Sequence, residues 1–308
     1  MNRRPLGDTG MWVPEIGFGA WQLGGDAWGR VDERDACLLV DLALDAGAGF
    51  FDTAPGYGAG RGEELLGRAL RGQRDRAMLC TKTGGWEPAA GGPAALRASL
   101  EGSLRRLGTD RVEVLLLHNP PDEVLDQNHP LYAEMEKLKA EGKIRAYGAS
   151  LDWSRPMRLA LERTRGQVIE VLFNALHQEP ALAFGQARER RVGLLAKVPL
   201  DSGWLGGAYT AASRFSGVRR RWSRADIRRR AALVGELGFM APPGTEMSQA
   251  ALQFVLAHPG VSCAIPGMRD LRQATSNLAA PGRSMPEETV RRVRELWERE
   301  VKDRPLPW

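Results

Sequence analysis

One rhythm runs through the whole sequence: a short apolar run ends at a loop, and an amphipathic segment of helical spacing follows. Short apolar runs bounded by turn residues are typical of strands buried on both faces, as in a parallel sheet. Runs of this kind lie at residues 16–20, 48–53, 77–82, 111–118, 143–150, 167–174, 192–199 and 261–267. Eight strand–helix units in 308 residues predict an α/β fold, a closed (β/α)8 TIM barrel.

The rival architecture is an open, doubly wound sheet, which usually carries a Gly-x-Gly-x-x-Gly fingerprint at its first strand-to-helix turn. The corresponding turn reads GFGAWQ, and Gln22 stands where the third glycine is required. The sequence also lacks the Gly-x-x-x-x-Gly-Lys-Ser/Thr loop that binds nucleotide phosphates. Both observations favour the barrel.

The segment before the first strand, RPLGDTGMWVPE, predicts a small hairpin around Asp8 and Gly10 that caps the bottom of the barrel. No linker or repeat divides the rest of the chain. We therefore expect a single domain over residues 1–308, with a longer loop insertion around 200–245.

Composition narrows the class of protein. Hydrophobic residues make up 43% of the chain, yet no apolar run reaches membrane-spanning length, and the N-terminus lacks the apolar segment of a secretory signal. We expect a cytoplasmic protein that does not bind membranes. The three cysteines, Cys37, Cys80 and Cys263, show no zinc-binding or disulfide spacing, so we expect no metal site.

The net charge of +5 arises from 43 basic and 38 acidic residues. The densest basic stretch, 219–230, includes Trp222 as its one aromatic residue. We interpret it as a solvated helix face, with packing against another subunit or an acidic cofactor as alternatives, and we expect no nucleic-acid binding. The oligomeric state stays open.

Polar residues end four consecutive apolar runs: Asp52, Lys82, His118 and Ser150. In a TIM barrel all strands end on one face, where active sites are built, so these groups should converge. Tyr57 follows Asp52 in the stretch FFDTAPGYG and should lie above them. Each residue alone is explained by an ordinary structural role, such as a turn, a surface lysine or a core histidine. Their coincidence at successive strand ends favours an active site.

The combination suits a carbonyl group. An ammonium such as Lys82 lowers the pKa of a nearby phenol, and Asp52 is a counter-charge that keeps a buried lysine charged. His118 can donate a hydrogen bond to a substrate oxygen, and Tyr57 can then deliver a proton to it. The set lacks a nucleophile with its base, so the simplest missing reactant is a hydride from a cofactor.

These stretches resemble the aldo-keto reductase family. FFDTAPGYG is similar to its Asp-Thr-Ala-x-x-Tyr-Gly signature, TKTG to its lysine strand, SLRRLGTDRVEVLLLHNP to its histidine strand, and YGAS to its Gly-x-Ser stretch. The resemblance implies a (β/α)8 barrel that binds NADP(H). It also implies that Tyr57 is the general acid, Lys82 the group that tunes its pKa, Asp52 the partner of Lys82, and His118 the residue that orients the carbonyl.

PLDSGWLGG and AIPGMRDLRQATSNLAA resemble the two further cofactor segments of this family. The resemblance implies that Ser150 binds the nicotinamide carboxamide. The cofactor-binding residues that it implies are Trp21, Ser150, Glu170, Lys197, Leu200, Gly203, Gly267, Arg269, Gln273 and Asn277.

Five positions depart from the family pattern in ways that bear on the cofactor. Leu151 stands where Asn is frequent, Glu170 where many members have Gln, and Lys197 where the best-known members stack a Tyr on the nicotinamide. Gly267 and Gln273 occupy positions where many members hold the 2′-phosphate with Lys and Arg. Arg269 and a helix end can still bind a phosphate, so we expect NADP(H), with NAD(H) as the alternative.

The expected substrate is a small-molecule carbonyl or alcohol, bound by Trp21, Trp86 and Asn119; Trp28 and Trp204 are further candidates for the wall of the pocket. Reduction of an aldehyde or ketone is the favoured reaction. A sugar or alcohol dehydrogenase working in the oxidative direction, or a cofactor-binding regulatory subunit on the same fold, are the alternatives. A hydrolase would need paired carboxylates at strand ends, and Glu170 is the only second candidate.

Overall fold

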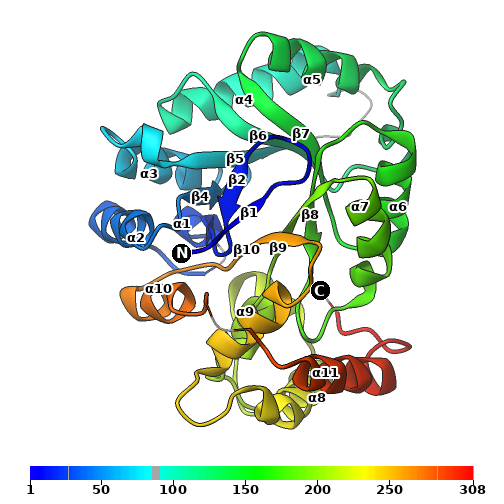
Figure 1. Ribbon diagram of the computed structural model, residues 1–308. Helices are drawn as coiled ribbons and strands as arrows, with labels where there is room; N and C mark the ends of the chain where they lie inside the picture. The colour runs from blue at the N-terminus through cyan, green and yellow to red at the C-terminus, as the bar shows by residue number, and fades with distance from the viewer. Residues whose placement is uncertain (27, 85–90, 283, 308) are drawn as a thin grey trace.

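Eight parallel strands form the centre of the computed structural model, which describes residues 1–26, 28–84, 91–282 and 284–307 (Figure 1). Each predicted apolar run coincides with one strand to within a few residues. The strands are β3 (Phe18–Gly19), β4 (Phe50–Asp52), β5 (Met78–Thr83), β6 (Val112–His118), β7 (Ile144–Leu151), β8 (Val168–Leu172), β9 (Gly193–Lys197) and β10 (Val261–Ile265).

Sequence neighbours pair in order from β3 to β10, and two bridges join the ends of the sheet. Ile16 pairs with Ala264 and Gly19 with Gly267, both in parallel orientation. The predicted (β/α)8 TIM barrel is therefore confirmed.

The backbone around the first strand is unusually crowded. A Cβ atom at Gly17 would lie 2.8 Å from the carbonyl oxygen of Phe50, and one at Gly19 would lie 3.0 Å from that of Ile265. Glycine allows the seam between β3 and its two neighbours to close at this distance.

Helices surround the barrel (Figure 1). They are α1 (Trp21–Gly24), α2 (Glu33–Asp45), α3 (Arg61–Ala69), α4 (Pro93–Leu107), α5 (Pro130–Ala140), α6 (Ser154–Arg163), α7 (Phe184–Glu189), α8 (Arg224–Glu236), α9 (Met247–Leu256), α10 (Leu271–Leu278) and α11 (Glu287–Glu300). Short 3-10 turns are η1 (Arg74–Arg76), η2 (Asp122–Val124), η3 (Glu179–Ala183), η4 (Asp201–Gly206), η5 (Gly217–Arg221) and η6 (Leu237–Met240). No helix in the described residues is long and apolar enough to cross a membrane.

Strands β1 (Arg3–Pro5) and β2 (Trp12–Pro14) form an antiparallel hairpin that lies across one end of the barrel (Figure 1). Leu6, Met11 and Val13 join the apolar cluster inside the barrel. Arg4 donates to the carbonyl of Val261, where β10 begins. The hairpin thus seals the end at which strands begin and leaves the opposite end for the site.

Residues 200–245 hold η4, η5, α8 and η6. Trp204, Tyr209, Phe215 and Trp222 pack there against one another, with ring centroids 4.9–6.2 Å apart. One large apolar cluster includes side chains from Ile16 to Leu306. We infer from this shared core that the chain is one domain.

Candidate active site

The polar residues expected at the strand ends lie together at the open end of the barrel. His118, Ser150 and Glu170 occupy one level, because β6, β7 and β8 pair in that register. Asp52 and His118 are the last residues of β4 and β6. Both line a cavity of about 540 Å³, together with Tyr57 and Glu170.

Lys82 lies at the centre of this group. Its side chain is fully buried, and its Nζ atom lies 2.5 Å from Asp52, 3.2 Å from Glu170 and 3.4 Å from the hydroxyl of Tyr57. Burial favours the neutral amine, but the carboxylates of Asp52 and Glu170 outweigh it and raise the pKa of Lys82. The lysine is therefore a fixed ammonium beside the phenol, as the sequence predicted, with a second counter-ion that the sequence did not reveal.

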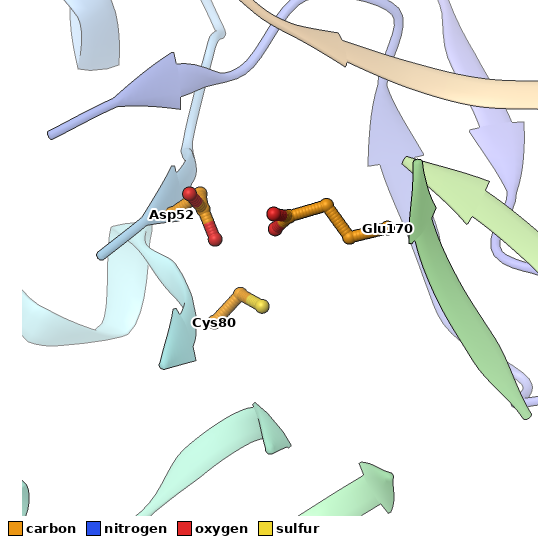
Figure 2. Close-up of side chains that lie close together, drawn as sticks. All are labelled: Asp52, Cys80 and Glu170. Carbon is orange, nitrogen blue, oxygen red and sulfur yellow. The ribbon is translucent and has the colours of Figure 1, made fainter. Parts of the chain in front are cut away.

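Asp52 and Glu170 point toward one another, with Cys80 beside Asp52 (Figure 2). Burial, and then the negative charge of Glu170, raises the pKa of Asp52. Burial also acts to raise the pKa of Glu170, but Lys82 and Lys197 hold it at about 2. When this pair takes up a proton, Asp52 receives it first.

Potential ligand atoms of Asp52, Cys80 and Glu170 lie within 4.8 Å of one another. Burial raises the pKa of the Cys80 thiol, which keeps it protonated. The ammonium of Lys82 lies within reach of both carboxylates and would repel a metal cation. The two carboxylates therefore form ion pairs with Lys82 inside the protein.

Tyr57 differs from expectation in one respect. The ammonium of Lys82 acts to lower the pKa of Tyr57, as predicted, but burial is the stronger effect, and Asp52 and Glu170 add to it. The pKa of Tyr57 is consequently raised. The phenol is a neutral O–H group, suited to giving a proton rather than to standing as a phenolate.

His118 is also neutral at physiological pH. Burial, and then the positive charges of Lys82 and Lys197, lowers its pKa to about 4. A neutral imidazole carries one N–H donor, which suits orientation of a carbonyl oxygen better than proton transfer. The next residue, Asn119, lines the cavity with φ = 48°, and its N–H donates to the carbonyl of Ser150.

Ser150 is fully buried, and other protein groups already engage its hydroxyl. It donates to Glu170 at 2.8 Å and accepts from Lys197 Nζ at 2.8 Å. Lys197 also pairs with Asp152 at 2.8 Å. A chain of polar contacts therefore runs from Asp152 and Lys197, which line the cavity, through the buried Ser150 and Glu170 to Lys82. Lys197 rather than Ser150 faces the cavity.

The other residues expected at a cofactor line this cavity: Trp21, Glu170, Lys197, Leu200, Gly203, Gly267, Arg269, Gln273 and Asn277. The cavity also has polar atoms suited to a polar ligand. Gln22 Oε1 and Ser202 Oγ are buried and lack a hydrogen-bond partner in the described part of the chain, although both residues line the cavity. A buried polar atom without a partner is costly, so a ligand at these atoms would be favoured. The residues present therefore fit a nucleotide cofactor.

Sequence reasoning missed two cationic residues of the wall, Arg219 and Arg272. Arg272 lies in AIPGMRDLRQATSNLAA, the segment that already resembled a cofactor-binding segment, so the sequence could have identified it. Arg219 belonged to the basic stretch interpreted as solvated, and that interpretation is wrong for two positions. Arg219 stacks on Trp28 at 4.6 Å and lines the cavity, whereas Arg230 is 1% exposed.

Of the residues expected at the substrate, Trp21 and Asn119 line the cavity, and Trp21 stacks on Tyr57 with ring centroids 5.7 Å apart. Trp28 also lines it. Trp86 lies outside the described residues. Trp204 is fully buried in the aromatic cluster of the insertion, so the hypothesis that it lines the pocket is wrong.

A (β/α)8 barrel with a phenol, an ammonium and a neutral imidazole around one cavity defines an acid–base site suited to a carbonyl group. A sequence model described as the Aldo/keto reductase family matches residues 15–298. The chain belongs to this family, and it is a nicotinamide-dependent oxidoreductase.

Among curated relatives, the aldo-keto reductase YhdN of Bacillus subtilis is 28% identical, over 98% of this chain and 96% of its own. L-galactose dehydrogenase of Arabidopsis thaliana is 29% identical, over 90% and 87%.

Among solved structures, a glycerol dehydrogenase from Gluconobacter oxydans has a TM-score of 0.82 at 27% identity, covering 99% of this chain and 97% of its own. An aldo/keto reductase from Klebsiella pneumoniae in complex with NADP and acetate has a TM-score of 0.75 at 28% identity, with 96% of both chains covered.

Proposed function

We propose that the protein reduces an aldehyde or ketone to an alcohol with NADP(H), and that Tyr57 is the proton donor. The observation that carries the proposal is the position of the Tyr57 hydroxyl. It lies 3.4 Å from the ammonium of Lys82 and lines the same cavity as His118. A proton donor, a group that stabilises its conjugate base and a neutral hydrogen-bond donor thus share one space.

Each group then has one task. His118 donates its N–H to the carbonyl oxygen and holds it beside Tyr57. When bound, the nicotinamide supplies the hydride that the carbonyl carbon accepts. Tyr57 gives its proton to the oxygen as negative charge develops there, and the Lys82 ammonium stabilises the phenolate that remains. Asp52 and Glu170 keep Lys82 charged throughout.

The guanidinium groups at the cavity support NADP(H) over NAD(H). Arg269 and Arg272 line the cavity beside Gln273 and Asn277 and can pair with a 2′-phosphate. The N-terminus of α10 is a weaker candidate, because the carboxylate of Asp270 already accepts from the backbone N–H of Gln273 there. The relative bound to NADP agrees with this preference.

Oxidation of a polyol or sugar is the second candidate. Two similar proteins are named glycerol dehydrogenase and L-galactose dehydrogenase. Asp26 and Asn119 add polar groups to a cavity that Trp21 and Trp28 line on the apolar side. Such a mixed wall suits a hydroxylated substrate as well as a simple carbonyl.

The replacement Tyr57→Phe tests the assigned role. We expect turnover with NADPH and a reactive aldehyde to fall by about 10²- to 10⁴-fold, the usual contribution of a general acid. Affinity for NADPH, followed by quenching of tryptophan fluorescence, should stay within about twofold, because the lost oxygen acts on the substrate.

Tyr132→Phe is the matched control, because Tyr132 is a buried tyrosine on α5 that does not line the cavity. It should leave turnover unchanged. Near-native turnover of Tyr57→Phe would contradict the proposal, and loss of both turnover and NADPH binding would show that Tyr57 shapes the fold rather than the reaction.

A further inference from the structure

The turn that follows β9 has an uncommon backbone. Val198, Asp201 and Ser202 have φ angles of 54°, 46° and 54°, and Gly203 has 94°. Residues other than glycine rarely adopt this left-handed region, and a β-branched valine there is an outlier. A turn of this kind persists only where its surroundings hold it.

The same turn forms one wall of the active-site cavity. Val198, Leu200, Ser202 and Gly203 all line it. Within the turn, the N–H groups of Gly203 and Leu205 both donate to the carbonyl of Leu200, at 2.9 and 3.1 Å. The shape of the wall therefore depends on keeping these left-handed residues in place.

A buried ion pair holds the turn from outside the cavity. Arg230 on α8 donates from Nε to Asp201 at 2.8 Å, and the side chains are 2% and 4% exposed. The Arg230 guanidinium stacks on the ring of Trp222 at 4.5 Å. Removing two charges from water costs free energy, and only good geometry and further hydrogen bonds offset this cost.

The second hydrogen bond of Arg230 reaches the C-terminal segment. Nη2 donates to the carbonyl of Pro307 at 2.9 Å, and Trp222 Nε1 donates to the same oxygen at 3.2 Å. One residue earlier on α8, Arg229 donates to the carbonyls of Glu300 and Arg304, both at 2.6 Å. The end of the chain is thus tied to the helix that holds the turn.

We propose that Arg230 is a positioning residue that couples the C-terminal segment, residues 300–307, to the cofactor-binding turn, residues 198–203. By pairing with Asp201 it keeps the left-handed turn in its binding shape, and the Pro307 carbonyl keeps Arg230 in place. The inference rests on the proposed function, because it takes this wall to hold the cofactor. The rate at which the cofactor dissociates should therefore depend on the C-terminal segment.

Asp201→Asn tests the ion pair alone. Asparagine tolerates the left-handed region as well as aspartate does, so the backbone preference is kept while the charge is lost. We expect the dissociation constant and dissociation rate of NADPH to rise by about tenfold. The single-turnover rate at saturating NADPH should change by less than about twofold, a split that a general loss of stability would not produce.

Arg230→Met should act in the same direction, with Arg228→Met, an exposed residue on the same helix, as its matched control. Truncation after Arg304 removes the Pro307 carbonyl and should do the same. In cofactor-free protein, all three perturbing changes should speed amide hydrogen exchange at Gly203 and Leu205 by about tenfold, whereas Arg228→Met should not.

Unchanged exchange and unchanged NADPH release in Asp201→Asn and in the truncated chain would overturn the coupling. If Arg230→Met fails to fold, these two variants decide the question. Failure of the proposed function would look different, since the wild-type protein itself would then bind neither NADPH nor NADH, while the exchange experiment would still report on the turn.

Discussion

Glu170 gives the site a second buried carboxylate, and the charge changes what the neighbouring groups do. It accepts from Ser150 at 2.8 Å and pairs with Lys82 at 3.2 Å. Its negative charge is among the causes that raise the pKa values of both Asp52 and Tyr57. Glu170 therefore makes the Tyr57 phenolate harder to form.

Glu170→Gln should shift the equilibrium between the phenol and the phenolate of Tyr57. A neutral amide no longer repels the phenolate, so the pKa of Tyr57 should fall. In the oxidative direction Tyr57 must act as a base, so alcohol oxidation at neutral pH should become several-fold faster, with its pH profile displaced to lower pH. Rates of oxidation between pH 6 and 10 measure this displacement. Glu246→Gln is the control, because Glu246 lines the cavity but bonds to Ser276. An unmoved or upward-shifted profile would refute the role.

At the scale of single residues the sequence predicted which residues gather and that Lys82 pairs with Asp52, but not that Glu170 also pairs with Lys82. Asp52, Lys82 and His118 were found because each ends an apolar run, and a barrel brings strand ends together. The contact between Glu170 and Lys82 crosses from β8 to β5, and it depends on side-chain reach that no spacing along the chain encodes. The net pKa of Tyr57 was unpredictable for the same reason, since burial and two carboxylates had to be weighed against one ammonium.

At the scale of elements, β7 and β8 meet at a backbone contact that only glycine permits. A Cβ atom at Gly148 would lie 1.7 Å from the carbonyl oxygen of Val168. This separation is far inside van der Waals contact and involves backbone on both sides. The two strands carry Ser150 and Glu170, so the contact also sets the register of the active site.

Gly148→Ala should therefore disrupt the barrel between β7 and β8. We expect a loss of at least about 3 kcal/mol in unfolding free energy, or no soluble protein, because overpacking at rigid backbone has no low-cost relaxation. Gly185→Ala on α7 is the matched control, since its Cβ would meet nothing within 4 Å. It should be neutral or stabilising by up to about 1 kcal/mol. Equal denaturation midpoints for the two variants would contradict this account.

The repeating elements were predictable, and the packing of the insertion around residues 200–245 was not. Each strand has its own apolar run and each following helix its own amphipathic spacing, so local pattern was sufficient. Residues 200–245 instead depend on distant partners, such as Arg219 on Trp28 and Arg230 on Pro307. A basic stretch with such partners has the same composition as a solvated one, which is why the sequence alone assigned it to the surface.

At the scale of the whole molecule, the hairpin seals one end of the barrel, and Asp52, Lys82, His118 and Glu170 gather near the other. Burial lowers the pKa values of His118, His177 and His258, and that of His118 falls to about 4. All three histidines are therefore protonated less readily in the folded protein than in an unfolded chain. The fold consequently has a built-in sensitivity to mild acid.

Stability of the cofactor-free protein should fall as the pH drops below about 6.5, the ordinary pKa of histidine. Between that value and the folded-state pKa of about 4 for His118, the unfolded chain binds protons that the folded chain does not, so protonation favours unfolding. His118 alone should cost about 1.4 kcal/mol by pH 5.5, and His177 and His258 act in the same sense. Asp52 opposes them, because a raised carboxyl pKa favours proton uptake by the folded state. Equilibrium urea unfolding at pH 7.5, 6.5 and 5.5 measures the net effect of these groups on the free energy of unfolding. A free energy of unfolding that stays constant or rises toward pH 5.5 would show that Asp52, rather than the buried histidines, dominates the acid response.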